Sequence, residues 1–378
     1  MLANLLTGLP RRALMRTVPG GFALPAWFAG LAINEWVEIA GTSLSSHSTM
    51  AAPRGSNAPQ GKQDAWCGWH IDTRNSRVYS VGQGGHDDYW GNEVNSIDLL
   101  DNTPTWTQRV TPTATGDVTA SGDYYADGKP ASVHGYHTSI FIESLDRALR
   151  FYGASPSKNG GASGVVTAYN ASTGAYDAST VWNPLGSPQA IGAGEGAYAK
   201  HPDTEDVYCL MYNSVLTRWN KGVPGSFTTL IASPGNPAAY YSAAACDPTR
   251  NVIFFLGGGA GGDMSRRYDI PGNSLSTITL TGTDISGNDG IGLIYVLATD
   301  RYYAFIPSAS GSAVYVITPT TGTSWNCSLL STTGGSALPD TSSNSAYHPW
   351  TKFLYVPQLS GAVFGPRWGS NLWFLRLH

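Results

Sequence analysis

Short apolar runs separated by turn-forming residues recur along this chain, and residues 66–106 contain one complete set of them. A first apolar run ends at the turn formed by residues 72–75, and a second, residues 78–81, ends in Gly84-Gly85. A third run, residues 94–99, leads to a fourth that opens on Trp106. Runs of this length bounded by Gly, Asn, Asp and Pro are typical of strands, and four with short connections form an antiparallel sheet.

The turn between the first two runs is repeated along the chain. Its six copies begin at Asp72, Glu143, His201, Asp247, Leu297 and His348, so that successive copies lie 71, 58, 46, 50 and 51 residues apart. An apolar second strand follows each turn, and the fourth strands carry a large apolar residue near their start, namely Trp106, Trp182, Phe227, Leu275 and Trp325. Such a side chain can fill the space between neighbouring blades of a β-propeller, whose signature is repetition at this period. The six turns predict an all-β, six-bladed propeller of four-stranded antiparallel blades.

The two ends of the chain are predicted to pair with each other. The sixth copy has room for only three strands, the last at residues 371–377, whereas residues 34–39 have the aromatic start of a fourth strand and precede the first complete blade. Pairing of 34–39 with 371–377 would close the ring and remove its exposed edges. We therefore expect an N-terminal arm, residues 1–30, followed by a propeller, residues 31–378.

Composition supports this architecture and excludes several others. The chain has 378 residues, 42% hydrophobic and only 13% charged, with 45 Gly, 23 Pro, 20 Tyr and 12 Trp, a profile of many short strands joined by tight turns. The net charge of -4 and the absence of basic runs interleaved with aromatic residues predict no nucleic-acid surface. Four cysteines lie far apart without CxxC spacing, so we expect buried free thiols, with no zinc and no disulfide framework; they are Cys67, Cys209, Cys246 and Cys327.

The N-terminal residues do not have the order of a secretory signal. Arg11, Arg12 and Arg16 precede a partly apolar stretch, residues 22–33, but another apolar piece comes before them, and prolines and glycines interrupt the stretch. No run approaches the ~18 apolar residues of a membrane span. We expect neither a signal peptide nor a membrane span, and we interpret residues 1–30 as an arm held by the fold or by a neighbouring protein.

The repeat carries further features in its second, third and fourth strands. The second strand ends in Gly-Gly at Gly84-Gly85 and Gly257-Gly258, the third strand is aromatic, and the fourth carries Trp. In these features residues 31–378 resemble Kelch-type propellers, including the central domain of galactose oxidase-like copper-radical enzymes. Each motif is degenerate and specifies fold better than function.

A second set of residues forms a more specific combination than these repeat motifs. His86 follows Gly-Gly, residues 91–94 read Gly-Asn-Glu-Val, and His134 stands before Tyr136-His137. This combination resembles Kelch-like proteins found in bacteria and in bacterial viruses. The resemblance implies a virion or surface component more than an intracellular adaptor.

Candidate chemistry gathers at one end of the predicted channel. In an antiparallel blade, the end of strand two and the start of strand one lie at the same end, so residues from successive blades converge there. We expect six residues to be neighbours at this mouth: His86, Asp87, Asp88, His134, Tyr136 and His137. Such a group could bind a metal or perform acid-base chemistry. It could equally satisfy backbone groups of the loops, as buried polar groups must, so structural, binding and catalytic interpretations all stay open.

Specific enzyme motifs are incomplete. Tyr136-His137 resembles the Tyr-His copper ligands of galactose oxidase-like enzymes, but it lies in an early blade, no further domain is expected to supply another ligand, and Cys67 has no identifiable partner. Residues 318–325 resemble the Asp-box of sialidases with Thr320 in place of its Asp. Nucleophile elbows, phosphate loops and HExxH helices are absent from the sequence. We therefore assign no catalytic residue, metal or cofactor.

Four tyrosines could stack on sugars, although packing is the alternative: Tyr124, Tyr125, Tyr240 and Tyr241. The leading hypothesis is a non-enzymatic structural or recognition propeller of a bacteriophage virion, associated with its tail or fibre. Residues 1–30 would dock it to other virion proteins, and a propeller face would meet a partner or a host-surface glycan. The alternatives are a carbohydrate- or alcohol-acting enzyme with its site at the mouth and a soluble glycan-binding lectin. The expected location is the virion or, otherwise, solution.

Overall fold

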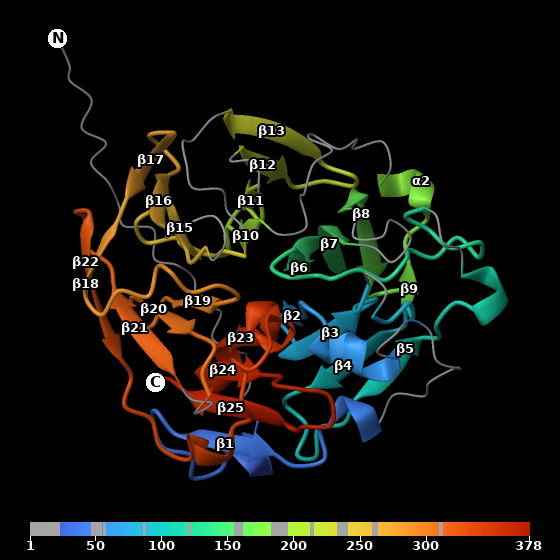
Figure 1. Ribbon diagram of the computed structural model, residues 1–378, viewed down its shortest axis with the longest axis horizontal. Coiled ribbons are helices and arrows are strands. Elements are labelled where there is room, and N and C mark those ends of the chain that lie inside the picture. Colours follow the sequence, from blue (N-terminus) through green and yellow to red (C-terminus); the bar gives the residue numbers. More distant parts are fainter. Residues whose placement is uncertain are drawn as a thin grey trace.

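Six sheets in the described part of the chain form a ring, which confirms the predicted six-bladed propeller (Figure 1). The computed structural model describes residues 23–46, 55, 58–85, 88–118, 122–154, 162–182, 196–211, 215–232, 241–258, 264–309 and 313–378. The chain passes round the ring in sequence order, and the first strand of each blade lies nearest the axis (Figure 1). Each of these inner strands contacts the inner strands on both sides, so that together they enclose a central channel.

The blades are numbered in chain order, with strands given from the channel outward. Blade 1 contains β2 (His70–Asp72), β3 (Arg77–Val81), β4 (Val94–Asp98) and β5 (Thr107–Val110); blade 2 contains β6 (Ser139–Ile142), β7 (Arg147–Ala154), β8 (Ala162–Asn170) and β9 (Ala175–Tyr176). Blade 3 contains β10 (Ala197–Lys200), β11 (Val207–Leu210), β12 (Leu216–Asn220) and β13 (Ser226–Ile231); blade 4 contains β14 (Ala243–Asp247), β15 (Val252–Leu256), β16 (Ser265–Asp269) and β17 (Ser274–Thr277). Blade 5 contains β19 (Gly292–Val296), β20 (Arg301–Phe305), β21 (Val314–Thr318) and β22 (Ser324–Leu329); blade 6 contains β23 (Phe353–Val356), β24 (Gly361–Phe364), β25 (Leu372–Arg376) and β1 (Trp36–Ile39).

Blade 5 has a fifth strand that the repeat pattern does not predict. The connection from blade 4 forms β18 (Thr279–Gly282), which pairs parallel to β22 with Leu280 opposite Trp325. Leu280 is buried in the same apolar cluster as Trp325. In β18, one inward-facing apolar residue thus stands between two threonines. Its packing holds the connection against the outer edge of blade 5.

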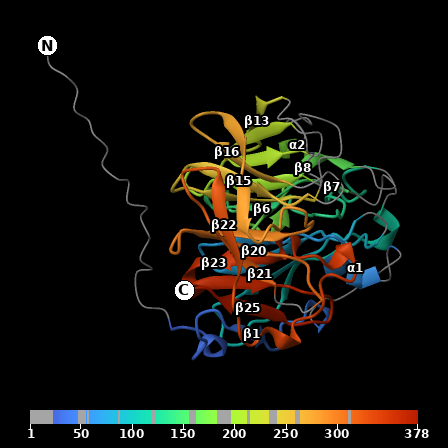
Figure 2. The same cartoon turned by 60° about the vertical axis from the view of Figure 1, so that its left-hand side comes forward.

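The predicted closure of the ring is confirmed. Strand β1 pairs antiparallel with β25, with Trp36 opposite Leu375 and Ile39 opposite Leu372. Figures 1 and 2 both show the two strands side by side. Trp36 is buried, and its ring lies 5.7 Å from that of Phe305 in the neighbouring blade 5.

Each pair of neighbouring blades shares one apolar cluster, so the core consists of six interfaces around the channel. The predicted large apolar residues of the fourth strands take part in these clusters, as expected. One was assigned wrongly to a strand: Trp182 lies in the short helix α2 (Ser179–Trp182) after the two-residue strand β9. Asp177 accepts hydrogen bonds from Arg147 and from the Trp182 indole, and these contacts turn the chain out of the sheet.

The sixth predicted turn was also assigned wrongly. Residues 348–352 do not join the first two strands of blade 6, because residues 353–356 form its inner strand, not its second strand. The turn between those strands is the 3-10 turn η12 (Pro357–Leu359), which ends on Ser360 with φ 53°. Residues 348–352 instead lead into the inner strand and contain the 3-10 turn η11 (Trp350–Lys352). Both segments carry proline, so turn-forming residues alone did not distinguish the two ends of the strand.

The described part of the N-terminal segment packs on the propeller. The 3-10 turn η1 (Ala26–Phe28) places Phe28 against Phe374, with ring centroids 5.7 Å apart, and the Trp27 indole donates to the Asp101 carbonyl at 3.2 Å. Arg376 donates to the Leu31 carbonyl at 2.6 Å. Residues 1–22 of the predicted arm lie outside the described residues.

Helices in the described residues are short. Besides those named above, they are η2 (Leu44–Ser46), η3 (Ala58–Gln60), α1 (Gly61–Asp64), η4 (Thr115–Asp117), η5 (Glu143–Leu145), η9 (Gly335–Ala337) and η10 (Ser345–Tyr347). None of the helices that the structure describes combines the length and the apolar character needed to cross a lipid bilayer.

Candidate functional site

The loops that lead into the inner strands share an unusual backbone conformation. A residue with left-handed φ stands just before the inner strand in five blades: Trp66 (47°), Tyr136 (41°), Tyr241 (58°), Gly290 (62°) and Trp350 (46°). Glycine adopts this conformation readily, but for a bulky side chain it is a steric outlier. Such residues cost on the order of 1–3 kcal/mol each and concentrate at binding and catalytic sites. Four of the five are aromatic, and we call Trp66, Tyr136, Tyr241 and Trp350 the aromatic cap.

Hydrogen bonds between blades hold these loops in place. The Tyr136 amide donates to the Trp66 carbonyl at 2.9 Å, the Gly290 amide to the Tyr241 carbonyl at 3.0 Å, and the Trp350 amide to the Gly290 carbonyl at 3.0 Å. The Thr351 hydroxyl donates to the Tyr136 carbonyl at 3.1 Å. Loops from neighbouring blades are thereby bonded to one another around the end of the channel.

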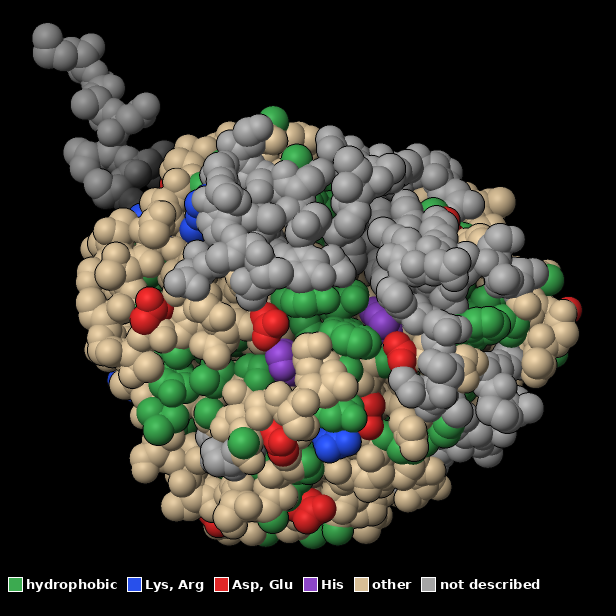
Figure 3. All heavy atoms as spheres, viewed as in Figure 1, with side chains coloured by type: hydrophobic (Ala, Val, Ile, Leu, Met, Phe, Trp, Pro, Cys, Tyr) green, Lys and Arg blue, Asp and Glu red, His purple; other side chains and the backbone are tan. Residues whose placement is uncertain are grey.

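The rings of the aromatic cap pack closely. Tyr136 stacks on Tyr241 with ring centroids 5.5 Å apart and planes at 27°, and Trp350 meets them edge to face at 5.3 and 5.2 Å. Tyr136 and Trp350 are buried, whereas Trp66 and Tyr241 are half-buried. Figure 3 shows hydrophobic side chains gathered near the middle of the face in view, with histidines beside them.

Two histidine-aspartate pairs flank the cap. His134 Nε2 lies 2.9 Å from Asp88 Oδ2, and the Trp66 ring packs on the His134 imidazole at 4.9 Å. On the other side, His348 Nδ1 lies 3.2 Å from Asp289 Oδ1, and the His348 ring stacks on Trp350 at 5.8 Å. The contact with His348 holds the pKa of Asp289 below its usual value, against the opposing effect of burial. The side chains of Asp88 and Asp289 remain 14% and 32% exposed, so each carboxylate can meet a ligand.

The structure brings three of the six predicted mouth residues into one chain of contacts. Asp88 pairs with His134, whose Nδ1 lies 3.5 Å from the Tyr136 hydroxyl. His137 points elsewhere: its ring packs on Trp350 at 5.3 Å, and it lines the central channel. His86 and Asp87 lie outside the described residues.

The four candidate stacking tyrosines occupy different environments. Tyr241 belongs to the aromatic cap, and Tyr240 lies outside the described residues. Tyr125 is buried, and its hydroxyl donates to the Trp90 carbonyl at 2.8 Å. Tyr124 is half-buried, and burial raises its pKa to about 12.

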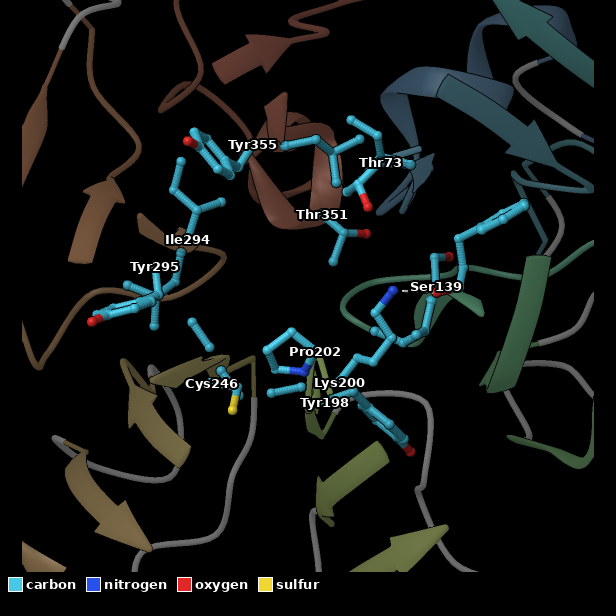
Figure 4. Close-up of a pocket in the computed structure, with 18 of the residues that line it drawn as sticks. Thr73, Ser139, Tyr198, Lys200, Pro202, Cys246, Ile294, Tyr295, Thr351 and Tyr355 are labelled. Carbon is cyan, nitrogen blue, oxygen red and sulfur yellow. Dashed lines mark hydrogen bonds between the residues drawn. The ribbon is translucent and has the colours of Figure 1, made fainter. Parts of the chain in front are cut away.

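Beneath the cap, the inner strands surround a cavity of about 680 Å³ (Figure 4). Figure 4 shows Ser139, Cys246 and Thr351 placed around its open centre, on three different blades. Small side chains leave this space, among them Ala199 of β10 and Ala244 of β14. The buried side chains of His137 and Trp350 close the cavity at the cap. At the opposite end, exposed Pro202, Leu297 and Pro357 line an opening on the face formed by the turns between the first two strands, which we call the turn face.

Charged side chains around this opening pair with one another. Lys200 forms an ion pair with Glu143, which also accepts a hydrogen bond from Thr73 at 2.7 Å. Burial opposes ionisation of Glu205, but contacts with Ser144 and Lys221 outweigh it and hold its pKa at about 2. The turn face therefore has fixed charges that are largely compensated.

Several residues of the site were not singled out from the sequence: Trp66, Asp289, His348 and Trp350. Trp66 and Trp350 could have been found from their positions in the sequence, because each stands, like Tyr136, shortly before an inner strand. Within the described residues, no group of three or more His, Cys, Asp or Glu side chains is arranged to hold a metal ion. The four cysteines are buried and free, as expected.

Comparison with known proteins yields similarity of fold. No family model and no curated protein matches the chain. Two solved structures with similar folds are auxiliary nutrient binding proteins from Bacteroides ovatus (12% identity, 90% of this chain and 76% of that one, TM-score 0.51) and Bacteroides thetaiotaomicron (11%, 90% and 75%, 0.52). A fungal alcohol oxidase of the AA5 family, solved with copper, matches at 13% identity over 82% of this chain and 62% of its own, with a TM-score of 0.47. At these identities the likeness concerns the propeller fold alone.

Proposed function

We propose that this propeller is a non-enzymatic recognition module that binds carbohydrate at its aromatic cap. The observation that carries the proposal is the left-handed backbone of four aromatic residues, Trp66, Tyr136, Tyr241 and Trp350, at one end of the channel. Strain of this kind persists only where the surroundings enforce it, and an observed outlier is a reasonable starting point for a hypothesis of function. Here the hydrogen bonds between blades enforce it.

The chemistry of the cap suits a sugar. Trp66 and Tyr241 are only half-buried, and their rings would offer apolar faces on which the C-H face of a pyranose can stack, as amphipathic aromatic side chains do at interfaces. Asp88 and Asp289 offer carboxylate oxygens that can accept hydrogen bonds from sugar hydroxyls, while His134 and His348 orient them. Because the cap is already held in place, a ligand would lose little free energy to ordering the protein.

The assembly proposed for this module is a bacteriophage virion, in its tail or fibre, where the cap would meet a host-surface glycan. The resemblance carried by His86, residues 91–94 and His134 supports this setting. Residues 1–30 would dock the propeller to other virion proteins. The part of this arm that the structure describes packs on blade 6, where Phe28 contacts Phe374 of β25.

One observation favours a second candidate function. Asp88, His134 and Tyr136 form a row of side chains in contact, a carboxylate, an imidazole and a phenol. Such a row could transfer a proton. A carbohydrate- or alcohol-acting enzyme would use it at the same mouth. That function requires turnover that is lost in His134→Gln.

A glycan array followed by product analysis separates the two. We expect the full chain to retain a defined set of glycans and to release them unchanged, as judged by mass spectrometry. Conversion of a retained glycan or alcohol would replace the recognition proposal with the enzymatic one. Failure of the array to retain any glycan would refute carbohydrate binding.

A further inference from the structure

Aliphatic side chains from several blades line the channel cavity. Ile71 of β2, Ile140 of β6 and Leu354 of β23 line it and are half-buried, as is Ala244 of β14. The volume of about 680 Å³ lies within the roughly 300–1,000 Å³ typical of small-molecule pockets, which are mostly apolar. A water molecule needs two or more polar partners to be held in place, and aliphatic side chains offer none. The cavity therefore suits an apolar occupant better than water.

The open end of the cavity is apolar as well. Leu297 lies there with 39% of its surface exposed, beside exposed Pro202 and Pro357. The charged side chains of Lys200 and Glu143 also line the cavity near this end. Exposed apolar surface rimmed by polar residues is typical of a binding site. An apolar ligand would thus meet apolar side chains from the entrance to the interior.

Hydroxyl groups of the lining are already engaged within the protein. Three lining residues donate to protein acceptors, namely Thr73 to Glu143 at 2.7 Å, Thr351 to the Tyr136 carbonyl at 3.1 Å and Tyr295 to Asp300 at 2.6 Å. A ligand that needed these donors would first have to break a bond that the fold makes. Recognition in the cavity would consequently depend on shape and apolar contact and not on hydrogen bonds to these groups.

The charges beside the open end favour a neutral ligand. Lys200 forms an ion pair with Glu143, and Arg74 pairs with Asp72 and Asp146 at 3.2 and 2.8 Å. A charged ligand would lose its hydration in an apolar cavity, and these side chains are already compensated by one another. The cost of losing hydration would thus be poorly offset for either sign of charge.

We propose that the channel cavity binds a neutral, largely hydrocarbon molecule of compact shape, the chemistry of an alkyl-substituted benzene. The ligand enters between Pro202, Leu297 and Pro357 on the turn face and packs against the aliphatic side chains of the inner strands. This site is separate from the carbohydrate site at the aromatic cap, and it goes beyond the proposed recognition function.

Calorimetric titration of the full chain with tert-butylbenzene and with the N,N,N-trimethylanilinium ion tests the proposal. The two probes have nearly the same shape, but the second carries a positive charge. We expect tert-butylbenzene to bind with one molecule per chain, and the cation to bind at least roughly a hundredfold more weakly because its charge would lose hydration in the cavity. Absence of binding by tert-butylbenzene up to its solubility limit, or equal or tighter binding of the cation, would overturn the proposal.

Two variants locate the binding. Ala244→Leu enlarges a half-buried side chain of the lining, and it should abolish binding of tert-butylbenzene. Ala175→Leu, at an exposed residue of the outer strand β9, is the matched control and should leave binding unchanged. Binding that survives Ala244→Leu would place the ligand elsewhere and refute the site.

A measurement on the unmodified chain guards against misfolding of Ala244→Leu. Cys246 lines the same cavity and is 9% exposed. Saturating tert-butylbenzene should slow alkylation of Cys246 by N-ethylmaleimide at least several-fold, because the ligand would occupy the route to the thiol. An unchanged alkylation rate at saturation would contradict binding in the channel.

Discussion

The backbone amide of Tyr136 donates to the carbonyl of Trp66 at 2.9 Å, and both residues have a left-handed backbone. The two belong to neighbouring blades, so the strained conformation of each aromatic residue is held by the next blade. Tyr241 and Gly290 repeat the arrangement at 3.0 Å on the other side of the channel. The aromatic cap therefore depends on the assembled ring and not on any single blade.

Gly290 occupies the place in this ring where a side chain is not tolerated. A Cβ there would lie 2.5 Å from Cβ and Nδ1 of His348, at φ +62°. We expect Gly290→Ala to lower the free energy of unfolding by about 1–2 kcal/mol for the backbone and a further ~1–3 kcal/mol for the overlap. Gly174→Ala is the matched control, because φ is +71° and nothing lies within 4 Å of its Cβ. Equal losses in urea unfolding of the two variants would contradict the predicted overlap.

The closing strand should contribute strongly to stability. Trp36 is 2% exposed and packs between blades 6 and 5, so Trp36→Ala removes a buried aromatic side chain and leaves a cavity. We expect a loss of about 3–5 kcal/mol in the free energy of unfolding. Ile33→Ala, at a side chain that is 57% exposed, should change it by less than about 0.5 kcal/mol. A loss at Trp36 no larger than that at Ile33 would show that closure does not stabilise the ring.

The pairing of Asp289 with His348 should make the stability of the fold depend on pH. A carboxyl whose folded pKa lies below its unfolded value of about 3.9 stabilises the fold above that pH, and the contribution disappears as pH falls through the folded pKa. Asp289→Asn should therefore destabilise the protein most above about pH 4, with the difference from the wild type shrinking in stronger acid. Exposed Asp117→Asn serves as the control. Thermal unfolding from pH 2 to 6 measures this, and a difference that grows as the pH falls would contradict it.

The rate at which each of the four cysteine thiols reacts should depend on its burial and on its access to the channel. Burial raises the pKa of Cys67 and of Cys327 to about 12 and raises those of Cys209 and Cys246 as well. Cys246 alone among the four is 9% exposed and lines the channel, whereas the others are 0% exposed. Peptide mapping after brief treatment with N-ethylmaleimide should find Cys246 modified first. Prior modification of Cys67, Cys209 or Cys327 would show that the channel is not the accessible route.

Sequence reasoning succeeded where topology places residues together. Trp36 could be assigned to the last blade because an unpaired fourth strand and a three-stranded final copy complete each other. Asp88 and His134 could be expected as neighbours because the end of one second strand lies beside the start of the next inner strand. Both inferences need only the order of antiparallel strands.

The sequence predicted the wrong feature where the same residue type occurs in more than one kind of structural position. Pro349 suggested a turn between strands, but Pro357 occupies that turn, and the error hid Trp350 and His348 among apparent turn residues. The pair of His348 with Asp289, and the aromatic cap as a whole, consequently went unseen. Their left-handed backbone is set by hydrogen bonds between blades, which no local sequence pattern reveals.

The central claim, that the aromatic cap recognises carbohydrate, depends most directly on the half-buried ring of Tyr241. The decisive measurement is titration of a glycan retained by the full chain into Tyr241→Ala and, as the matched control, Tyr355→Ala, which removes a half-buried ring near the turn face at the opposite end of the channel. Loss of one stacked ring should weaken binding by roughly tenfold, the scale of an aromatic contact of about 1 kcal/mol or slightly more. We predict that loss for Tyr241→Ala and unchanged affinity for Tyr355→Ala. Unchanged affinity in a folded Tyr241→Ala protein would contradict the account.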